Sequence, residues 1–264
     1  MNIILNGRTI YYELHGPSTG PVVTLLHHGL GMTRAWDEQI PALAEAGYRV
    51  LGYDRWGYGQ SDARSQLSLP HFEEDLQDLH ALTQSLRIHQ ASLVGHSDGG
   101  TISLYFAERY PEVVTRMLIV AAHIYVEPKM ESGIQELRSA YEQEPKFRDG
   151  MQRAHGEKAE QVFQNWYGGW VQESNLRWDM RPLLGKIRCP VLVAQGLEDE
   201  HGTVQHAKDL AQAIPGAELW LVPGAAHMLP RDMPEAFNPR LLKFLEPELN
   251  RRERIKRIKA ENSR

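Results

Sequence analysis

The sequence is short of cysteine and of long apolar runs. Cys189 is the single cysteine among 264 residues, so no disulfide within the chain is possible, and we interpret it as a small buried hydrophobe. The longest apolar run near the middle, residues 117–122, is far too short to span a bilayer. Residues 1–8 contain no basic leader ahead of a long apolar stretch. We therefore predict a cytoplasmic protein without a membrane segment.

Neither sign of charge is in large excess, which limits the classes of partner. The net charge is -5, so there is no basic excess to attract nucleic acid. Spaced cysteines and a His-Glu-x-x-His motif are absent, and no Gly-x-Gly-x-x-Gly follows the first parallel strand. We expect no metal, no cofactor and no nucleic acid. The predicted partner is a small molecule, and the sequence leaves the oligomeric state open.

The order of apolar runs predicts an α/β fold. Residues 3–5 and 9–14 form strand-like runs on either side of Asn6-Gly7, a pair typical of a tight hairpin, so the sheet should begin antiparallel. Short apolar runs then alternate with helical segments, which favours a mostly parallel central sheet. These runs are residues 22–27, 49–53, 91–94, 117–121, 191–194 and 218–222.

The alternation is interrupted once, and this divides the chain. Leucines at helical spacing follow Pro70, which we place in the first turn of a helix. Between residues 124 and 182 the sequence is helical, charged and rich in tryptophan, and we interpret it as an inserted helical cap. The predicted division is a core domain of residues 1–123 and 183–250, a cap of residues 124–182, and a basic tail of residues 251–264. A solvated terminal helix is the simplest interpretation of that tail.

A serine nucleophile is indicated by Gly95-His96-Ser97-Asp98-Gly99-Gly100. A serine raised on a sharp turn between a strand and a helix needs small residues two positions before and after it, and Gly95 and Gly99 occupy those positions. The motif follows an apolar run and precedes a helical one, as such a turn requires. We predict that Ser97 is the nucleophile.

A serine hydroxyl needs a histidine as base and a carboxylate to orient that histidine. In folds with this turn, the acid and then the histidine follow the serine along the chain. Three acids lie after the run at 191–194, namely Glu198, Asp199 and Glu200. His227 follows the run at 218–222, and His201 is its competitor.

Hydrolysis also needs donors for the oxyanion that develops on the attacked carbonyl. The backbone amides of Asp98, directly after the nucleophile, and of Leu30, in His28-Gly29-Leu30-Gly31, are the candidates. The Asp98 carboxylate has two interpretations. An acid is favoured in the first turn of any helix, or it contacts a cationic or hydroxylated group of the substrate.

Four motifs together resemble the α/β-hydrolase-fold serine hydrolases over nearly the full length. Three are the segments 28–31, 54–61 and 95–100; the fourth is a late pair, 196–199 and 224–227. The resemblance selects Asp199 as the acid and His227 as the base. Ser97-Asp98-Gly99-Gly100 and the helical insertion are similar to valacyclovirase-like and enol-lactonase-like esterases.

This resemblance implies a cofactor-independent serine hydrolase that cleaves a small carboxylic ester or lactone through an acyl-enzyme on Ser97. We expect substrate contacts from Asp98, His123, Trp166 and Trp170. Two alternatives stay open. One is hydrolysis of a carbon-carbon bond, or perhydrolysis, on the same triad; Asp98 departs from the apolar residue often found in the former group. The other is ligand binding without catalysis on the same fold.

Overall fold

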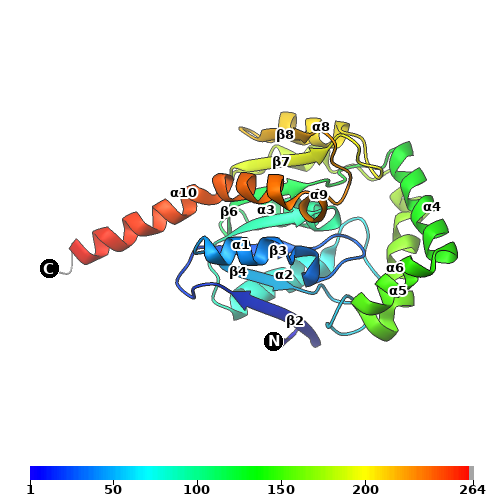
Figure 1. The fold of residues 1–264 in the computed structure, drawn as a ribbon, viewed down its shortest axis with the longest axis horizontal. Helices are drawn as coiled ribbons and strands as arrows, with labels where there is room; N and C mark the ends of the chain where they lie inside the picture. Colours follow the sequence, from blue (N-terminus) through cyan, green and yellow to red (C-terminus); the bar gives the residue numbers. More distant parts are fainter. Residues whose placement is uncertain (262–264) are drawn as a thin grey trace.

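A single twisted sheet organises the chain (Figure 1). The computed structural model describes residues 1–261, with side chains as far as residue 250, and within this part the sheet has eight strands in the order β1-β2-β4-β3-β5-β6-β7-β8. The strands are β1 (Asn2–Leu5), β2 (Arg8–His15), β3 (Val22–Leu26), β4 (Arg49–Tyr53), β5 (Ala91–His96), β6 (Val114–Val120), β7 (Val191–Gly196) and β8 (Glu218–Val222).

The N-terminal strands are antiparallel and the others parallel. Asn6 and Gly7 both have positive φ, 49° and 79°, which is the conformation of a two-residue hairpin turn, and β1 pairs with β2 in register Leu5 to Arg8. β2 pairs antiparallel with β4, while the pairs from β4 onward are parallel. The predicted fold class, a mostly parallel sheet with an antiparallel start, is confirmed.

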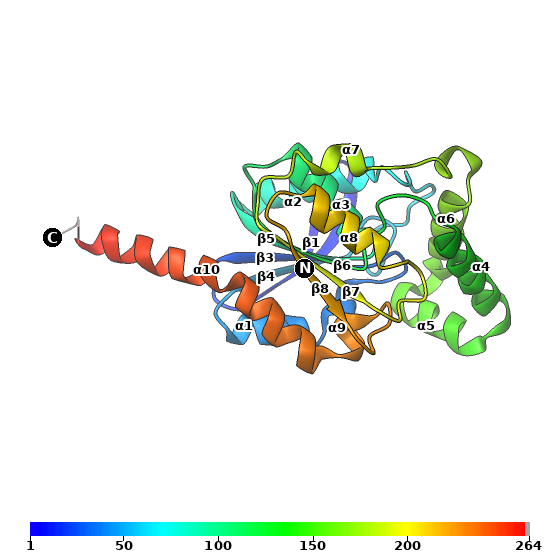
Figure 2. The ribbon, with the colours of Figure 1, turned by 90° about the horizontal axis from the view of Figure 1, so that it is seen from above.

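Helices cover both faces of the sheet (Figure 2). One face carries α1 (Gln39–Glu45), α9 (Leu229–Asp232) and α10 (Pro234–Glu261). The other carries α2 (Glu73–Ser85), α3 (Asp98–Arg109), α7 (Arg181–Leu184) and α8 (Gln205–Ala213). Strands buried on both faces explain why the parallel runs are almost continuously apolar.

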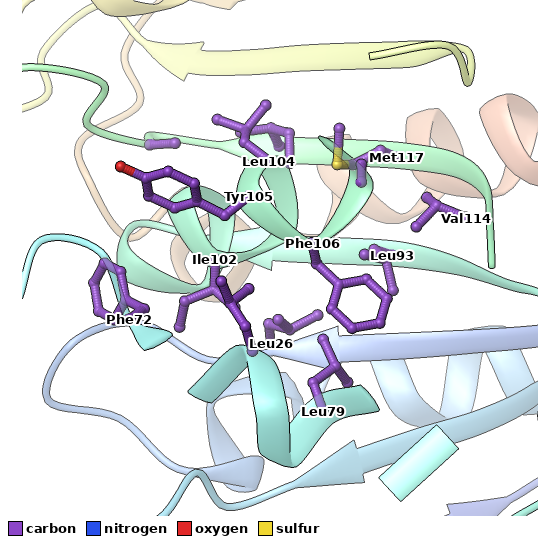
Figure 3. Packing of buried hydrophobic residues seen from close by; sticks show 14 of the residues in the cluster. Leu26, Phe72, Leu79, Leu93, Ile102, Leu104, Tyr105, Phe106, Val114 and Met117 are labelled. Atoms are coloured by element: carbon purple, nitrogen blue, oxygen red, sulfur yellow. The ribbon is translucent and has the colours of Figure 1, made fainter. Parts of the chain in front are cut away.

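Two apolar clusters fill these interfaces. Between the sheet and helices α2 and α3, Leu79, Leu93, Ile102 and Phe106 interlock and are fully buried (Figure 3). On the opposite face Phe237 of α10 packs among sheet residues in a second buried cluster. This packing fixes α3, and with it the turn that precedes α3, against the sheet.

The start of α2 differs from its prediction. The helix begins at Glu73 rather than at Pro70, because Phe72 adopts a left-handed conformation with φ of 51° and ends the preceding loop. Glu73, Glu74 and Asp75 then occupy the first turn, where carboxylates interact favourably with the helix dipole. The periodic leucines mark the helix correctly, but Pro70 does not mark its first residue.

A separate helical layer lies between β6 and β7 in sequence, within the predicted insertion. It comprises α4 (Pro128–Gln143), α5 (Pro145–His155), η2 (Gly156–Lys158) and α6 (Ala159–Trp170), and we call these residues, 128–170, the cap. Short 3-10 helices also occur at Thr33–Trp36 (η1) and Glu173–Asn175 (η3). The cap has its own small core, in which the rings of Tyr141 and Phe163 stack 4.0 Å apart. It stands to one side of the sheet (Figures 1 and 2).

The C-terminal helix extends beyond the domain. α10 runs to Glu261, and its second half points away from the sheet (Figure 1). The side chains of the basic tail predicted at residues 251–264 lie outside the described part of the chain. Among the residues that the structure does describe, no helix is both long enough and apolar enough to cross a membrane.

Candidate active site

Ser97 lies on a sharp turn between β5 and α3. Its backbone has φ of 54° and ψ of -120°, a conformation that costs free energy for any residue with a side chain. The surrounding hydrogen bonds hold it there: the Ser97 N–H donates to the Val120 carbonyl at 2.8 Å, and the Ser97 carbonyl accepts from Gly100 and Thr101. Strain retained at one polar residue in a cavity is typical of a functional position.

Two glycines allow the backbone to come this close. A Cβ on Gly95 would lie 2.3 Å from the carbonyl oxygen of Gly99, and one on Gly99 would lie 2.1 Å from that of Leu26. Both contacts are with backbone atoms that cannot rotate away. The turn therefore needs glycine at both positions, as the sequence pattern predicts.

Asp199 and His227 meet near the carboxyl ends of β7 and β8. The Nδ1 atom of His227 lies 3.0 Å from each carboxylate oxygen of Asp199. Because a carboxylate accepts hydrogen bonds, this contact places a proton on Nδ1 and leaves Nε2 with a free lone pair. Ser97 and His227 line the same cavity.

The Asp199 carboxylate is held in its ionised form. It also accepts from the Gln195 side chain at 2.7 Å and from the backbone N–H groups of His201 and Gly202. Burial raises the pKa of Asp199, but the charge and hydrogen bond of His227, with the N–H of His201, outweigh burial and lower it. An ionised, fixed carboxylate is what orients a catalytic imidazole.

The competing residues do not form the contact between a carboxylate and an imidazole ring. Glu198 is exposed, and the Glu200 carboxylate accepts from the backbone N–H of His227 rather than from its ring. His201 contributes its backbone N–H to Asp199, while its ring stands edge-on to that of His227 with centroids 4.7 Å apart. The structure thus pairs the His227 ring with the Asp199 carboxylate, and not with that of Glu198 or Glu200.

His96 forms a hydrogen bond with the backbone of His227, a contact that the sequence did not predict. Its Nε2–H donates to the backbone carbonyl of His227 at 2.9 Å. Burial lowers the pKa of His96 to about 3, so the ring is neutral at physiological pH. A neutral donor here fixes the His227 loop without adding a positive charge beside the imidazole.

The two residues that carry the predicted oxyanion donors line the same cavity. Asp98 is the first residue of α3, where the backbone N–H has no partner within the helix. Leu30 follows β3 in the loop 28–31, and within the described residues its N–H forms no hydrogen bond. Both residues line the cavity with Ser97.

The Asp98 carboxylate is buried between the core and the cap. Its Oδ2 atom accepts from the indole N–H of Trp166 at 3.2 Å and lies 3.9 Å from the Arg55 guanidinium. Burial raises its pKa to about 6, although Arg55 opposes the rise. A Cβ on Gly29 would lie 2.1 Å from Trp166 Nε1, so glycine is needed for the indole to reach Asp98.

Arg55 is a further residue that sequence reasoning missed. It is completely buried and pairs with Asp75, which in turn binds Arg64 at 2.7 Å. Arg64, Asp75 and Arg55 thus form a row of charged groups that ends beside the Asp98 carboxylate. In the sequence, Arg55 belongs to the motif at residues 54–61. The spacing of that motif does not indicate that Arg55 lies near Asp98.

The cavity has a volume of about 450 Å³ and lies between the core and the cap, and most of the residues that the cap contributes to its lining are apolar. All the predicted substrate contacts, Asp98, His123, Trp166 and Trp170, line it. Burial lowers the pKa of His123 to about 3, so that ring is neutral. Within the described residues, no group of three or more His, Cys, Asp or Glu side chains is arranged to hold a metal ion.

The cap also contacts the loop that carries the acid. The Lys129 ammonium donates to the backbone carbonyl of Asp199 at 2.5 Å. Nearby, Glu127 accepts from the backbone N–H and the hydroxyl of Thr203. These contacts join the start of α4 to the segment that follows β7.

Comparison with known proteins agrees with this geometry. Residues 21–168 match the family described as alpha/beta hydrolase fold. The chain belongs to the α/β hydrolase fold family. It is 28% identical to the serine hydrolase BPHL of Mus musculus, over 92% of this chain and 85% of that protein. With such relatives, this member of the family is a serine hydrolase.

Other relatives show the range of the α/β hydrolase fold family. The bifunctional esterase/perhydrolase DCH of Acinetobacter calcoaceticus is 28% identical, over 91% of this chain and 97% of that protein. The enol-lactonase of Burkholderia xenovorans LB400 superposes with a TM-score of 0.76 at 23% identity, over 93% of this chain and 100% of the other. The latter likeness supports the fold. The predicted resemblance to esterases of this family is confirmed.

Gly99→Ala is expected to destabilise the protein by about 1–3 kcal/mol, because the added methyl group must displace the backbone of β3. Urea unfolding measures the change. Gly168→Ala is the matched control: it lies in helix α6 with open space around its Cβ position, and alanine there should add about 0.5–1 kcal/mol. Equal stability of the two variants would contradict the close approach at Gly99.

Asp98→Asn should gain stability relative to the parent by about 1–3 kcal/mol as the pH rises from about 4 to about 7. The folded pKa of about 6 lies above the ordinary 3.8, so the unfolded chain loses its proton first and the parent loses stability through this interval. Asparagine cannot ionise and avoids that loss.

Unfolding by urea at both pH values measures the effect of Asp98→Asn, with the exposed Asp149→Asn as the control. A constant offset between Asp98→Asn and the parent at the two pH values would show that the Asp98 carboxylate does not titrate as described.

Proposed function

We propose that the protein is a cofactor-independent hydrolase of small carboxylic esters or lactones, acting through an acyl-enzyme on Ser97. The observation that carries the proposal is the contact of His227 Nδ1 with both oxygens of Asp199, beside the strained Ser97 in one cavity. A nucleophile, an oriented base and a fixed acid together constitute the machinery of acyl transfer.

In the first half of the reaction, His227 Nε2 takes the Ser97 hydroxyl proton as Oγ attacks the carbonyl carbon of the substrate. The backbone N–H groups of Leu30 and Asp98 stabilise the oxyanion. When the tetrahedral intermediate collapses, His227 returns the proton to the leaving alcohol. Water, activated by His227, then attacks the acyl-enzyme and releases the acid and free Ser97.

The residues that line the cavity favour a substrate with a small, largely apolar acyl group. Trp166 and Trp170 come from the cap, which we assign to the inserted domain of residues 124–182, and the neutral His123 ring also lines the cavity. The Asp98 carboxylate is already bonded to Trp166 and lies near Arg55, which favours a role in shaping the pocket. Esterase and lactonase names among the relatives agree with this substrate class.

Perhydrolysis is the second candidate, because the esterase relative from Acinetobacter calcoaceticus also bears the name perhydrolase. The acyl-enzyme would be attacked by hydrogen peroxide instead of water, with the triad in the same roles. Assaying peracid formation when peroxide is added to an ester distinguishes the two reactions.

Ser97→Ala is expected to abolish turnover of chromogenic esters and labelling by a fluorophosphonate probe, because Ser97 is the only serine, threonine or cysteine among the described residues that line the cavity. A panel of esters of graded acyl length, with a lactone included, measures turnover in the parent. Thermal unfolding checks that the variant is folded. Labelling that persists in folded Ser97→Ala would refute the assignment.

Asp199→Asn should lower kcat by about 10³–10⁴-fold, since an amide cannot hold the imidazole in the required tautomer or stabilise its charged form. Glu198→Gln, an exposed neighbour on the same loop, is the matched control and should change kcat by less than about twofold. Steady-state kinetics on one ester compare them. Similar losses in both variants would remove Asp199 from its role.

A further inference from the structure

His155, at the end of cap helix α5, contacts the loop that bears the proposed oxyanion donor. Its Nε2 atom lies 3.1 Å from the backbone carbonyl oxygen of Leu30, and its Nδ1 atom lies 3.0 Å from the backbone nitrogen of Gly59. The side chain is 2% exposed. Neither the motif analysis nor the proposed reaction gives this buried histidine a role.

The two contacts fix the tautomer of His155. The backbone N–H of Gly59 can only donate, so Nδ1 must be the unprotonated nitrogen. The proton therefore sits on Nε2 and is donated to the Leu30 carbonyl. Burial lowers the pKa of His155, which keeps the ring in the neutral form that this pair of bonds requires.

The Leu30 carbonyl depends on the cap, whereas the rest of its loop is held by the core. The His28 carbonyl accepts from Gly31 N–H at 3.1 Å and from the Arg55 guanidinium at 3.3 Å, and His27 Nδ1 lies 2.8 Å from it. The bond from His155 is the one contact described for the Leu30 carbonyl. It thus restrains a residue that lines the cavity with Ser97.

The same helix end is docked on a second core loop. Lys158, three residues after His155, donates to the carbonyls of Ser61 and Tyr58, and the Tyr58 ring stands edge-on to His155 with centroids 5.9 Å apart. Gly59 belongs to this loop. His155 consequently bridges the loop at residues 54–61 and the oxyanion loop.

We infer that His155 is a positioning residue: by docking the cap and bonding the Leu30 carbonyl, it sets the Leu30 N–H in place for the oxyanion. The inference rests on the proposed function. It means that the oxyanion site is complete only when the cap is seated on the core.

Two substitutions separate the two bonds of His155. In His155→Asn the side-chain amide reaches the level of Nδ1, so it can accept from Gly59 but does not reach Leu30. In His155→Gln the amide nitrogen reaches the level of Nε2 and retains a donor for Leu30. Asn165→Ala is the matched control, because Asn165 joins the cap to the Arg64 carbonyl, and its side-chain hydrogen bonds within the described residues go to Arg64 and Gln161.

Three readouts are measured on each folded variant: kcat and KM on one ester, the rate of fluorophosphonate labelling, and the affinity for a boronic acid that mimics the tetrahedral intermediate. His155→Asn should lower kcat, labelling rate and boronate affinity by about 10- to 100-fold with KM within about threefold of the parent. His155→Gln and Asn165→Ala should keep all of these within about threefold of the parent.

Parental kcat and boronate affinity in His155→Asn would overturn the inference, as would a rise in KM alone. A tenfold loss of boronate affinity in folded His155→Gln would also overturn it. This second test can be made even if His155→Asn does not fold. The labelling rate does not depend on the identity of the substrate. A parent that is labelled but hydrolyses no ester would therefore contradict the proposed function while still testing His155.

Discussion

The positive φ of Ser97 is the constraint on which the site depends. To hold a serine in that conformation, the chain must leave β5 and enter α3 without any spacer, so the helix packs directly on the sheet. The Cβ positions of Gly95 and Gly99 are then occupied by backbone. Because the neighbouring strands are parallel, their carboxyl ends meet at the same edge. His227, which follows β8, therefore lines the cavity with Ser97 and bonds Asp199, which follows β7.

Groups from both the core and the cap interact with the carboxylate of Asp98, the residue that follows the Ser97 turn. Arg55 and Asp75 form a buried ion pair in the core, and the Arg55 guanidinium lies close to the Asp98 carboxylate. From the cap, Trp166 donates to the same carboxylate. A buried charge without such partners would be costly, so the residue beside the nucleophile is satisfied jointly by both layers of the protein.

Local patterns predicted the parts of the structure that depend on local physics. The Asn6-Gly7 hairpin and the Ser97 turn follow from backbone conformation. The position of a residue after a strand left several acids and two histidines as candidates, and the family resemblance selected Asp199 and His227 from them. The start of α2 was misplaced because the left-handed Phe72, not Pro70, ends the loop.

Contacts between distant segments had no local signal. The bonds of Arg55 to Asp75, of Lys129 to the Asp199 carbonyl, and of His96 to the His227 carbonyl depend on how loops pack after the sheet has formed. Lys129 is a lysine near a helix start and His96 a histidine inside a strand, and neither type at such a place indicates its partner. Sequence spacing alone could not have found these bonds.

The close packing of the Trp166 indole against Gly29 limits which caps this core can carry. The cap supplies about half of the residues that line the cavity, so exchange of the cap would alter the shape of the pocket while leaving Ser97, Asp199 and His227 in place. Yet Trp166 fits only where the recipient core has no side chain at residue 29 and an acid at residue 98. Lys129 adds a similar requirement at the acid loop. A cap with these contacts therefore requires matching residues at these positions of the core.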